Sequence, residues 1–209
     1  MACLSPIRKT DKKYGVLWLD CGICVKCVIK RRNDWTFRLM QEHQDSITSA
    51  FVTLTYNDSN LNYGNENPSL YYRDLQNYFK RLRKISQASS LPPIKYYAVG
   101  EYGEKNKRPH YHAIIFNALP DKIFRAWTKQ KSEFSSDRVS MGIVHTGSVT
   151  QESIYYVTKY VHKRKQKEPD DTMPQKALMS KNLGYGYIKR CGEYHKKTKN
   201  TFVTYPGGY

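Results

Sequence analysis

The sequence has few acidic residues and no long apolar run. Asp and Glu number 18 against 35 Lys and Arg, a formal net charge of +17, which favours a polyanionic partner such as nucleic acid. No segment approaches the roughly 20 apolar residues of a membrane span. The N-terminal stretch also lacks the long apolar core of a secretory signal. These absences predict an intracellular protein without a membrane partner.

Cysteine is scarce, with five in 209 residues, yet three are clustered as "CGICVKC". Reduced intracellular cysteines in such a cluster indicate a metal site rather than disulfides. The preferred interpretation is a structural zinc site, with these ligands: Cys3, Cys21, Cys24 and Cys27. Iron–sulfur ligation is less favoured because Arg31 stands at the usual offset of the fourth cysteine. Unliganded thiols stay open as an alternative, as does Cys191, either as a missing ligand or as a core residue.

Tyrosine is abundant, with 18 copies among many basic side chains. Aromatic rings between cations suit stacking on single-stranded nucleic acid. Core tyrosines under a solvated basic surface would give the same composition. Composition alone does not choose between the two.

The apolar periodicity alternates between helical and strand spacing. The predicted elements are a helix from Val25, a strand over 50–56, a helix carrying Leu75 to Ile85, strands over 92–100 and 109–116, a helix capped by Asp121 and running to about Lys131, a strand over 142–150 and a helix over 151–165. This order predicts an α+β protein with a ferredoxin-like βαββαβ antiparallel sheet, its helices on one face, and an extra helix at each end.

The chain is predicted to form a single domain in three parts. Residues 1–48 form a cysteine-rich segment with a basic helix, and 49–168 form the core. Residues 169–209 form a basic, Gly- and Tyr-rich segment packed on that core, with short strands over 185–190 and 201–205.

The strand "PHYHAIIF" begins with two histidines one residue apart. Side chains alternate along a strand, so His110 and His112 point one way while Tyr111 and Ala113 point the other. If the preceding strand forms a hairpin with this one, Glu101 lies beside His110. Two imidazoles and a carboxylate suit Mn²⁺ or Mg²⁺. Surface histidines and a carboxylate that merely ends a hairpin are the alternatives.

The segment "YVTKYVHK" presents tyrosines and lysines at helical spacing. Tyr156 and Tyr160 share one face, and Lys159 and Lys163 repeat the same offset. A phenol with an ordinary pKa near 10 needs a nearby cation or metal to act as a nucleophile. The lysines could supply that charge or stabilise a phosphate, whereas Tyr155 is predicted to point into the core. A basic amphipathic helix packed on the sheet is the alternative.

Three segments in order, "FVTLTYND", "GEYGEKNKRPHYHAIIF" and "YVTKYVHK", resemble the motifs of the HUH superfamily of rolling-circle nicking enzymes, whose palm resembles an RNA-recognition motif. With the later "ALMSKNLGYGYI", the chain is most similar to replication initiators of microvirus (gokushovirus-like) single-stranded DNA bacteriophages. The resemblance implies the metal ligands His110, His112 and Glu101 and the nucleophiles Tyr156 and Tyr160. Glu104 competes with Glu101 for the acidic position. Members of the group often run longer than this chain.

The resemblance also implies a function and its partners. The protein is expected to nick single-stranded DNA at an origin, presented in a hairpin or an unwound duplex, through a 5′-phosphotyrosine intermediate. A 3′-hydroxyl is freed for rolling-circle replication by host helicase and polymerase in the cytoplasm of a bacterial host, and rejoining releases circles. The alternatives are a non-catalytic single-stranded nucleic-acid-binding protein, and an HUH transposase or relaxase.

Overall fold

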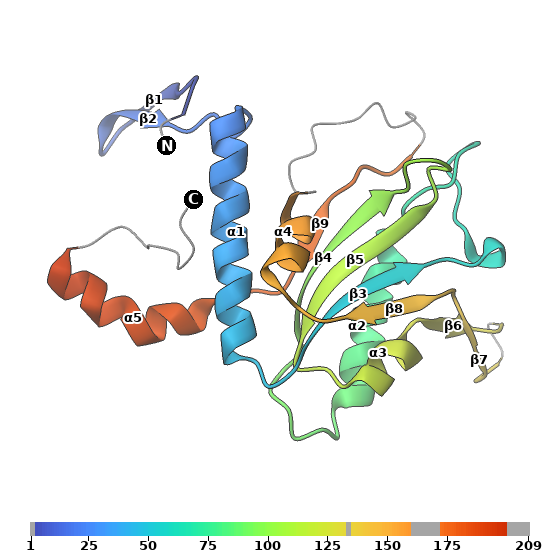
Figure 1. Ribbon diagram of the computed structural model, residues 1–209. Coiled ribbons are helices and arrows are strands. Elements are labelled where there is room, and N and C mark those ends of the chain that lie inside the picture. The colour runs from blue at the N-terminus through green and yellow to red at the C-terminus, as the bar shows by residue number, and fades with distance from the viewer. Residues whose placement is uncertain (1–2, 133–134, 160–171, 200–209) are drawn as a thin grey trace.

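The computed structural model describes residues 3–132, 135–159 and 172–199, and its centre is a five-stranded antiparallel sheet (Figure 1). The strand order is β8-β3-β5-β4-β9. The strands are β3 (Ser49–Thr55), β4 (Lys95–Tyr102), β5 (Pro109–Phe116), β8 (Val144–Gly147) and β9 (Ala177–Met179). The sheet confirms the predicted α+β class and four of the predicted strands, to which β9 is added at one edge.

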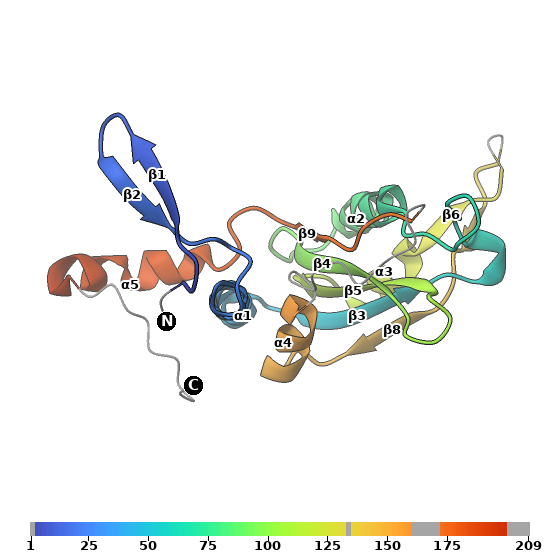
Figure 2. The same ribbon diagram turned by 90° about the horizontal axis from the view of Figure 1, so that it is seen from above.

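Helices cover both faces of this sheet, so the prediction that they lie on one face is wrong. The helices are α1 (Val25–Asp45), η1 (Asp58–Asn60), α2 (Tyr72–Ser86), α3 (Pro120–Ala126), α4 (Gln151–Lys159) and α5 (Tyr185–Thr198). Figure 2 shows α2 on one side of the sheet and α4 on the other. None of the described helices is both long and apolar enough to span a bilayer.

The alternation along β5 explains the two layers. Tyr111, Ala113 and Ile115 belong to the apolar cluster under α2 and α3. Ile114 and Phe116 belong to a second cluster, with side chains of α1 and α4. A strand that is apolar on both faces needs a packed layer on each side. The first two residues of the second face are His110 and His112, so that face changes from apolar to polar at the start of the strand.

The helix α2 carries the predicted apolar stripe. Leu75, Tyr78, Phe79 and Leu82 are buried against the sheet, while Ile85 packs at the margin of the same cluster. On the other face, α1 and α4 lie against each other, where the hydroxyls of Thr36 and Thr158 are 3.3 Å apart. The α1–α4 pair therefore fixes α4 over the polar start of β5.

Two predicted elements differ in the structure. The helix expected from Asp121 to about Lys131 begins at Pro120 and ends at Ala126, and its N-cap residue is Leu119. It ends early because Trp127 is buried and its indole N–H donates to the Thr55 carbonyl over 2.8 Å. A short hairpin, β6 (Thr128–Gln130) and β7 (Arg138–Ser140), follows instead.

The strand predicted over 185–190 is the first half of α5 (Figure 1). Six residues are too few to separate a period of 2 from one of 3.6, and tertiary contacts with α1 decide. Tyr187 packs edge-on against Phe37 with ring centroids 4.8 Å apart, and Arg190 pairs with Asp45. The strand predicted over 201–205 lies outside the described residues. The division into three parts stays a prediction.

A hairpin that the periodicity did not predict precedes α1. It consists of β1 (Ile7–Asp11) and β2 (Gly15–Leu19), and it projects away from the sheet (Figure 2). All of its residues are exposed or half-buried. Its position therefore does not come from a hydrophobic core.

Candidate metal and tyrosine site

The two histidines and Glu101 come together at the polar start of β5. In the register between β4 and β5, Glu101 lies directly opposite His110, which confirms the predicted hairpin pairing. The Glu101 Oε2 atom is 3.2 Å from Nε2 of His112 and 3.6 Å from Nε2 of His110. One ligand atom from each residue lies within 4.8 Å of the others. The three side chains therefore form a compact donor set of two nitrogens and one carboxylate.

The Nδ1 atoms of both imidazoles are held by neighbouring groups. The hydroxyl of Thr53, opposite His112 on β3, lies 2.9 Å from Nδ1 of His112. The carbonyl of Arg108 lies 3.1 Å from Nδ1 of His110. Contacts of this kind fix the ring orientation and leave Nε2 of each ring directed toward the common centre. Sequence reasoning missed this role of Thr53, because pairing of β3 with β5 joins residues 59 positions apart.

His112 is built as a neutral ligand. It is buried, and its ring stacks on Phe51 with centroids 5.6 Å apart. Burial lowers the pKa of His112 below its ordinary value, assisted by the charges of His110 and Lys159 and opposed by Glu101. An uncharged imidazole is the form that binds a metal ion.

Tyr156, on α4, reaches this donor set from the neighbouring layer. Its hydroxyl donates to Glu101 Oε2 over 3.2 Å, and its ring meets that of His112 edge-on at 5.1 Å. The ammonium of Lys159 lies 4.2 Å from the centre of the Tyr156 ring. A cation over the ring face favours negative charge on the phenol. The structure therefore places a phenol, a cation and the metal-type donor set in contact.

The other residues of the predicted site have different positions. Tyr160 and Lys163 lie outside the described residues. Glu104 is exposed in the loop between β4 and β5 and is not part of the donor set. Tyr155 is 40% exposed, with the Arg32 guanidinium 4.1 Å from its ring centre, so the prediction that it lies in the core is wrong. It points away because the buried face of α4 is made by Ile154, Val157 and Thr158.

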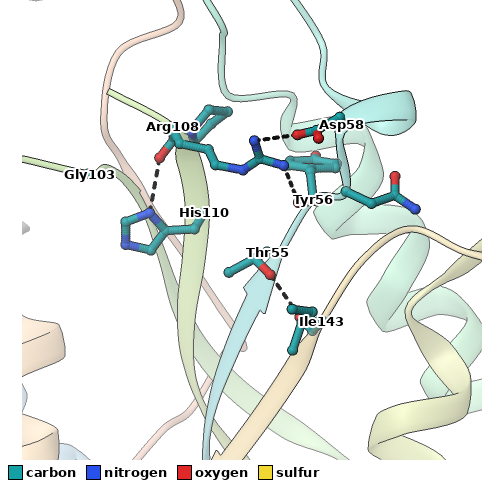
Figure 3. A pocket seen from close by; sticks show the side chains of 9 residues that line it. Thr55, Tyr56, Asp58, Gly103, Arg108, His110 and Ile143 are labelled. Atoms are coloured by element: carbon teal, nitrogen blue, oxygen red, sulfur yellow. Dashed lines mark hydrogen bonds and ion pairs between the residues drawn. The ribbon is translucent and has the colours of Figure 1, made fainter. Parts of the chain in front are cut away.

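A cavity of about 450 Å³ adjoins His110 (Figure 3). Its lining includes Thr55, Tyr56, Gly103 and Ile143. Arg108 crosses it, donating through Nη1 to Asp58 over 2.7 Å and through Nη2 to the Tyr56 carbonyl over 2.6 Å. The donor set therefore opens onto a hollow that has a fixed guanidinium in its wall.

The four predicted cysteine ligands also meet, at the base of the β1–β2 hairpin. The Sγ atoms of Cys24 and Cys27 are 3.4 Å apart, and the pairs Cys3–Cys24 and Cys21–Cys27 are each 3.9 Å apart. Four sulfurs bound tetrahedrally to zinc at ~2.3 Å would lie about 3.8 Å apart. Cys191 is elsewhere, on α5, so the fourth thiol of the cluster is Cys3.

Backbone contacts prepare part of this cluster for a cation. Hydrogen bonds from the backbone at Leu4 and Cys27 lower the pKa of the Cys24 thiol to about 6. Backbone hydrogen bonds also lower the pKa of Cys21. Burial raises the pKa of Cys27 to about 12, and a metal ion would displace that proton. The donor set is therefore that of a four-thiolate structural site.

Comparison with known proteins identifies the family. Residues 49–165 match the model of the replication-associated protein ORF2 family. Replication-associated protein VP4 of Bdellovibrio phage phiMH2K is 29% identical over 234 residues, covering 100% of this chain and 73% of the relative. Replication-associated protein ORF2 of Spiroplasma virus 4 is 30% identical over 197 residues, covering 89% of this chain and 62% of the relative.

A third relative is matched over a shorter stretch. Replication-associated protein ORF4 of Chlamydia phage 1 is 28% identical over 156 residues, covering 70% of this chain and 38% of the relative. The chain thus spans under two thirds of the length of two of these three proteins. No solved structure matches the chain. The family match extends over more than half of the sequence, and the chain belongs to the replication-associated protein ORF2 family of microvirus phages.

Proposed function

We propose that the protein is a divalent-metal-dependent nickase that attaches itself to single-stranded DNA through a tyrosine. The observation that carries this proposal is the hydrogen bond from the Tyr156 hydroxyl to Glu101, within the donor set of Glu101, His110 and His112. A nucleophile touching a metal-type site is the combination that phosphodiester transfer requires. Membership of a phage replication-associated family supports DNA as the substrate.

The donor set fits Mn²⁺ or Mg²⁺. Two neutral imidazoles and one carboxylate cover part of a coordination sphere and leave positions for phosphate oxygens. The rings are held through Nδ1 by Thr53 and by the Arg108 carbonyl, as the second shell of a metal site requires. When bound, such an ion supplies Lewis-acid polarisation of the scissile phosphate.

The protein's own groups would then move one proton and exchange one ester bond. The Tyr156 oxygen forms a bond to phosphorus as the bond from phosphorus to the 3′ oxygen breaks. The phenolic proton passes to Glu101 Oε2, its hydrogen-bond partner, and exchange through solvent returns one proton to the departing 3′ oxygen. The Lys159 ammonium, over the Tyr156 ring, stabilises the developing phenolate. The products are a 5′-phosphotyrosine and a free 3′-hydroxyl.

The ester makes the reaction reversible, because a phosphotyrosine retains the energy of the phosphodiester. Attack by a 3′-hydroxyl rejoins DNA ends, so the same site can release circles during rolling-circle replication. Tyr160, one turn after Tyr156, and Lys163 are proposed as a second nucleophile and its cation. The DNA partner is an origin strand, in a hairpin or unwound duplex, and host helicase and polymerase would extend the 3′ end in the bacterial cytoplasm.

The proposal includes a ferredoxin-like HUH fold for the core. Four central strands follow the spatial order β8-β3-β5-β4, all antiparallel, with α2 and α3 on the same face. That arrangement supports a βαββαβ unit. The helix α4 is then an addition that brings the nucleophile to the opposite face.

The cysteine cluster is proposed to hold structural zinc. Its sulfur separations are close to those of a tetrahedral site, and all four positions are taken by protein ligands, so no site is open to substrate. Elemental analysis of protein purified without chelator should give about one zinc per chain. Chain without stoichiometric zinc or iron would contradict this assignment.

The nickase is tested with single-stranded oligonucleotides that tile the origin region of the phage genome and carry a 3′ label. After incubation with Mn²⁺, denaturing gels should show a labelled protein–DNA adduct. Tyr156→Phe combined with Tyr160→Phe should abolish it, whereas the matched control Tyr155→Phe, an exposed neighbour, should retain it. Binding of every oligonucleotide without any adduct would instead identify a non-catalytic binding protein.

A further inference from the structure

The β1–β2 hairpin presents aromatic and basic side chains to solvent. We call residues 7–19 the arm. Its two aromatic side chains, Tyr14 and Trp18, are 67% and 65% exposed. Within the arm, Arg8, Lys9, Lys12 and Lys13 stand against the single acidic residue Asp11. The arm is therefore a cationic and aromatic surface.

The register places these side chains on defined faces. Arg8 lies opposite Trp18 in the β1–β2 pair, so the guanidinium and the indole share a face. Lys9 lies opposite Leu17 on the other face. An exposed indole beside a guanidinium is the arrangement that stacks a base while neutralising its phosphate.

The turn of the arm is rigid, and it holds the remaining charges. The Asp11 carboxylate accepts hydrogen bonds from the backbone N–H groups of Lys13, at 2.8 Å, and Tyr14, at 3.0 Å. Gly15 completes the turn with φ of 73°, a value that favours glycine. The acidic residue is thus used internally, while both lysines and Tyr14 point into solvent at the tip.

The cysteine cluster clamps both ends of the arm. Cys3 precedes β1 and Cys21 follows β2, and the Cys21 backbone N–H donates to Cys3 Sγ over 3.3 Å. Cys24 and Cys27 belong to the start of α1. A two-stranded hairpin without a core is marginal in water, so the clamp, rather than burial, orients the arm on α1.

We propose that the arm is a second binding element for single-stranded DNA, separate from the tyrosine site. Trp18 and Tyr14 stack on bases, and Arg8, Lys12 and Lys13 contact phosphates. Charge complementarity identifies the occupant, since the arm carries four cationic side chains and one acid that is engaged in its own turn. This inference rests on the proposed function only in taking DNA as the polyanion.

The test uses the full chain and a fluorescein-labelled 30-nucleotide oligo-dT, without added divalent metal, so that binding is measured without cleavage. Trp18→Ala should weaken binding about fivefold or more, the lower limit for loss of one stacked base. Trp18→Phe should retain most of the affinity because any aromatic face can stack. The matched control Phe124→Ala removes an exposed aromatic side chain from α3 and should bind like the wild type.

The charges are tested through the salt dependence of the same binding. Lys12→Ser with Lys13→Ser should reduce the slope of log affinity against log salt by about 1.4, since each phosphate contact on a single strand contributes about 0.7. The matched control, Lys129→Ser with Lys131→Ser, removes the same charge from the β6 hairpin and should reduce the slope less. Zinc content and circular dichroism of each variant establish that the fold is retained.

The outcomes separate this proposal from the nickase. Unchanged affinity of Trp18→Ala and an unchanged salt slope of the lysine pair, in a wild type that forms adducts, overturn the arm alone. Loss of binding in the arm variants, in a wild type that forms no adduct, supports the arm and overturns the nickase. Arm variants that alter only the oligomeric state would show that the arm contacts a second copy of the chain, which also overturns the proposal.

Discussion

The two metal-type clusters of this protein have opposite relations to the fold. Glu101, His110 and His112 lie on paired strands in the centre of a sheet that has helices on both faces. The four cysteines lie beside a hairpin whose residues are all exposed or half-buried. The fold therefore organises the first cluster, whereas the second cluster organises the fold around it.

The largest expected effect is loss of chemistry without loss of structure. His110→Ala should reduce adduct formation by about 10³-fold or more, because the Lewis acid is worth several kcal/mol in the transition state. The side chain is half-buried, so the unfolding midpoint should fall by about 4 °C or less. Gel assays and thermal denaturation measure the two effects. A large drop in the midpoint would show that the His110 side chain supports the sheet.

The reverse effect is expected at the cysteine cluster. Cys24→Ser should release the zinc and speed amide hydrogen exchange in residues 7–19 by about 100-fold or more, because binding free energy at such a site is folding free energy. Exchange in β3 and β5 should change little. Exchange in the hairpin that is indifferent to zinc would remove the difference between the two clusters.

The histidine strand and its hairpin partner could be predicted from sequence because the relevant spacings are local. Alternation put His110 and His112 on one face, and a short loop made pairing with the Glu101 strand the simplest topology. The α2 stripe was visible for the same reason. The meeting of Cys3 with the three clustered cysteines followed from counting thiols rather than from periodicity.

The non-local features were not predictable in this way. Thr53 reaches His112 through pairing across 59 residues, and no local pattern encodes that register. The face chosen by α4 depends on its packing with α1, which also turns Tyr155 outward. The β1–β2 hairpin has no buried residue to produce a clear alternation, and the start of α5 has a pattern too short to distinguish helix from strand.

A smaller effect is expected for the support behind the ligands. Thr53→Val removes the hydroxyl at Nδ1 of His112 while keeping the shape of the side chain, and Mn²⁺ affinity should fall about tenfold. Isothermal titration calorimetry measures it. Thr55→Val is the matched control, since the Thr55 hydroxyl donates to the Ile143 carbonyl and not to a ligand. Equal losses in both variants would contradict a specific role for Thr53.

The smallest effect is expected at the competing carboxylate. Glu104→Gln should leave adduct formation within about twofold of the wild type, as for other exposed substitutions, because Glu104 is exposed outside the donor set. Glu101→Gln, the same chemical change at the buried position, should abolish metal-dependent activity. Similar rates for the two variants would reverse the assignment.

The contact between Tyr156 and Glu101 spans 55 residues, and this has a consequence for synthesis of the protein in an infected cell. The carboxylate and both imidazoles belong to one hairpin, which can close as soon as it leaves the ribosome. At about 5–20 residues per second, the tyrosine follows several seconds later and must still dock with its helix on α1. A newly made chain is therefore expected to be able to hold its ion before it can cut, so that nicking begins only on completed cores.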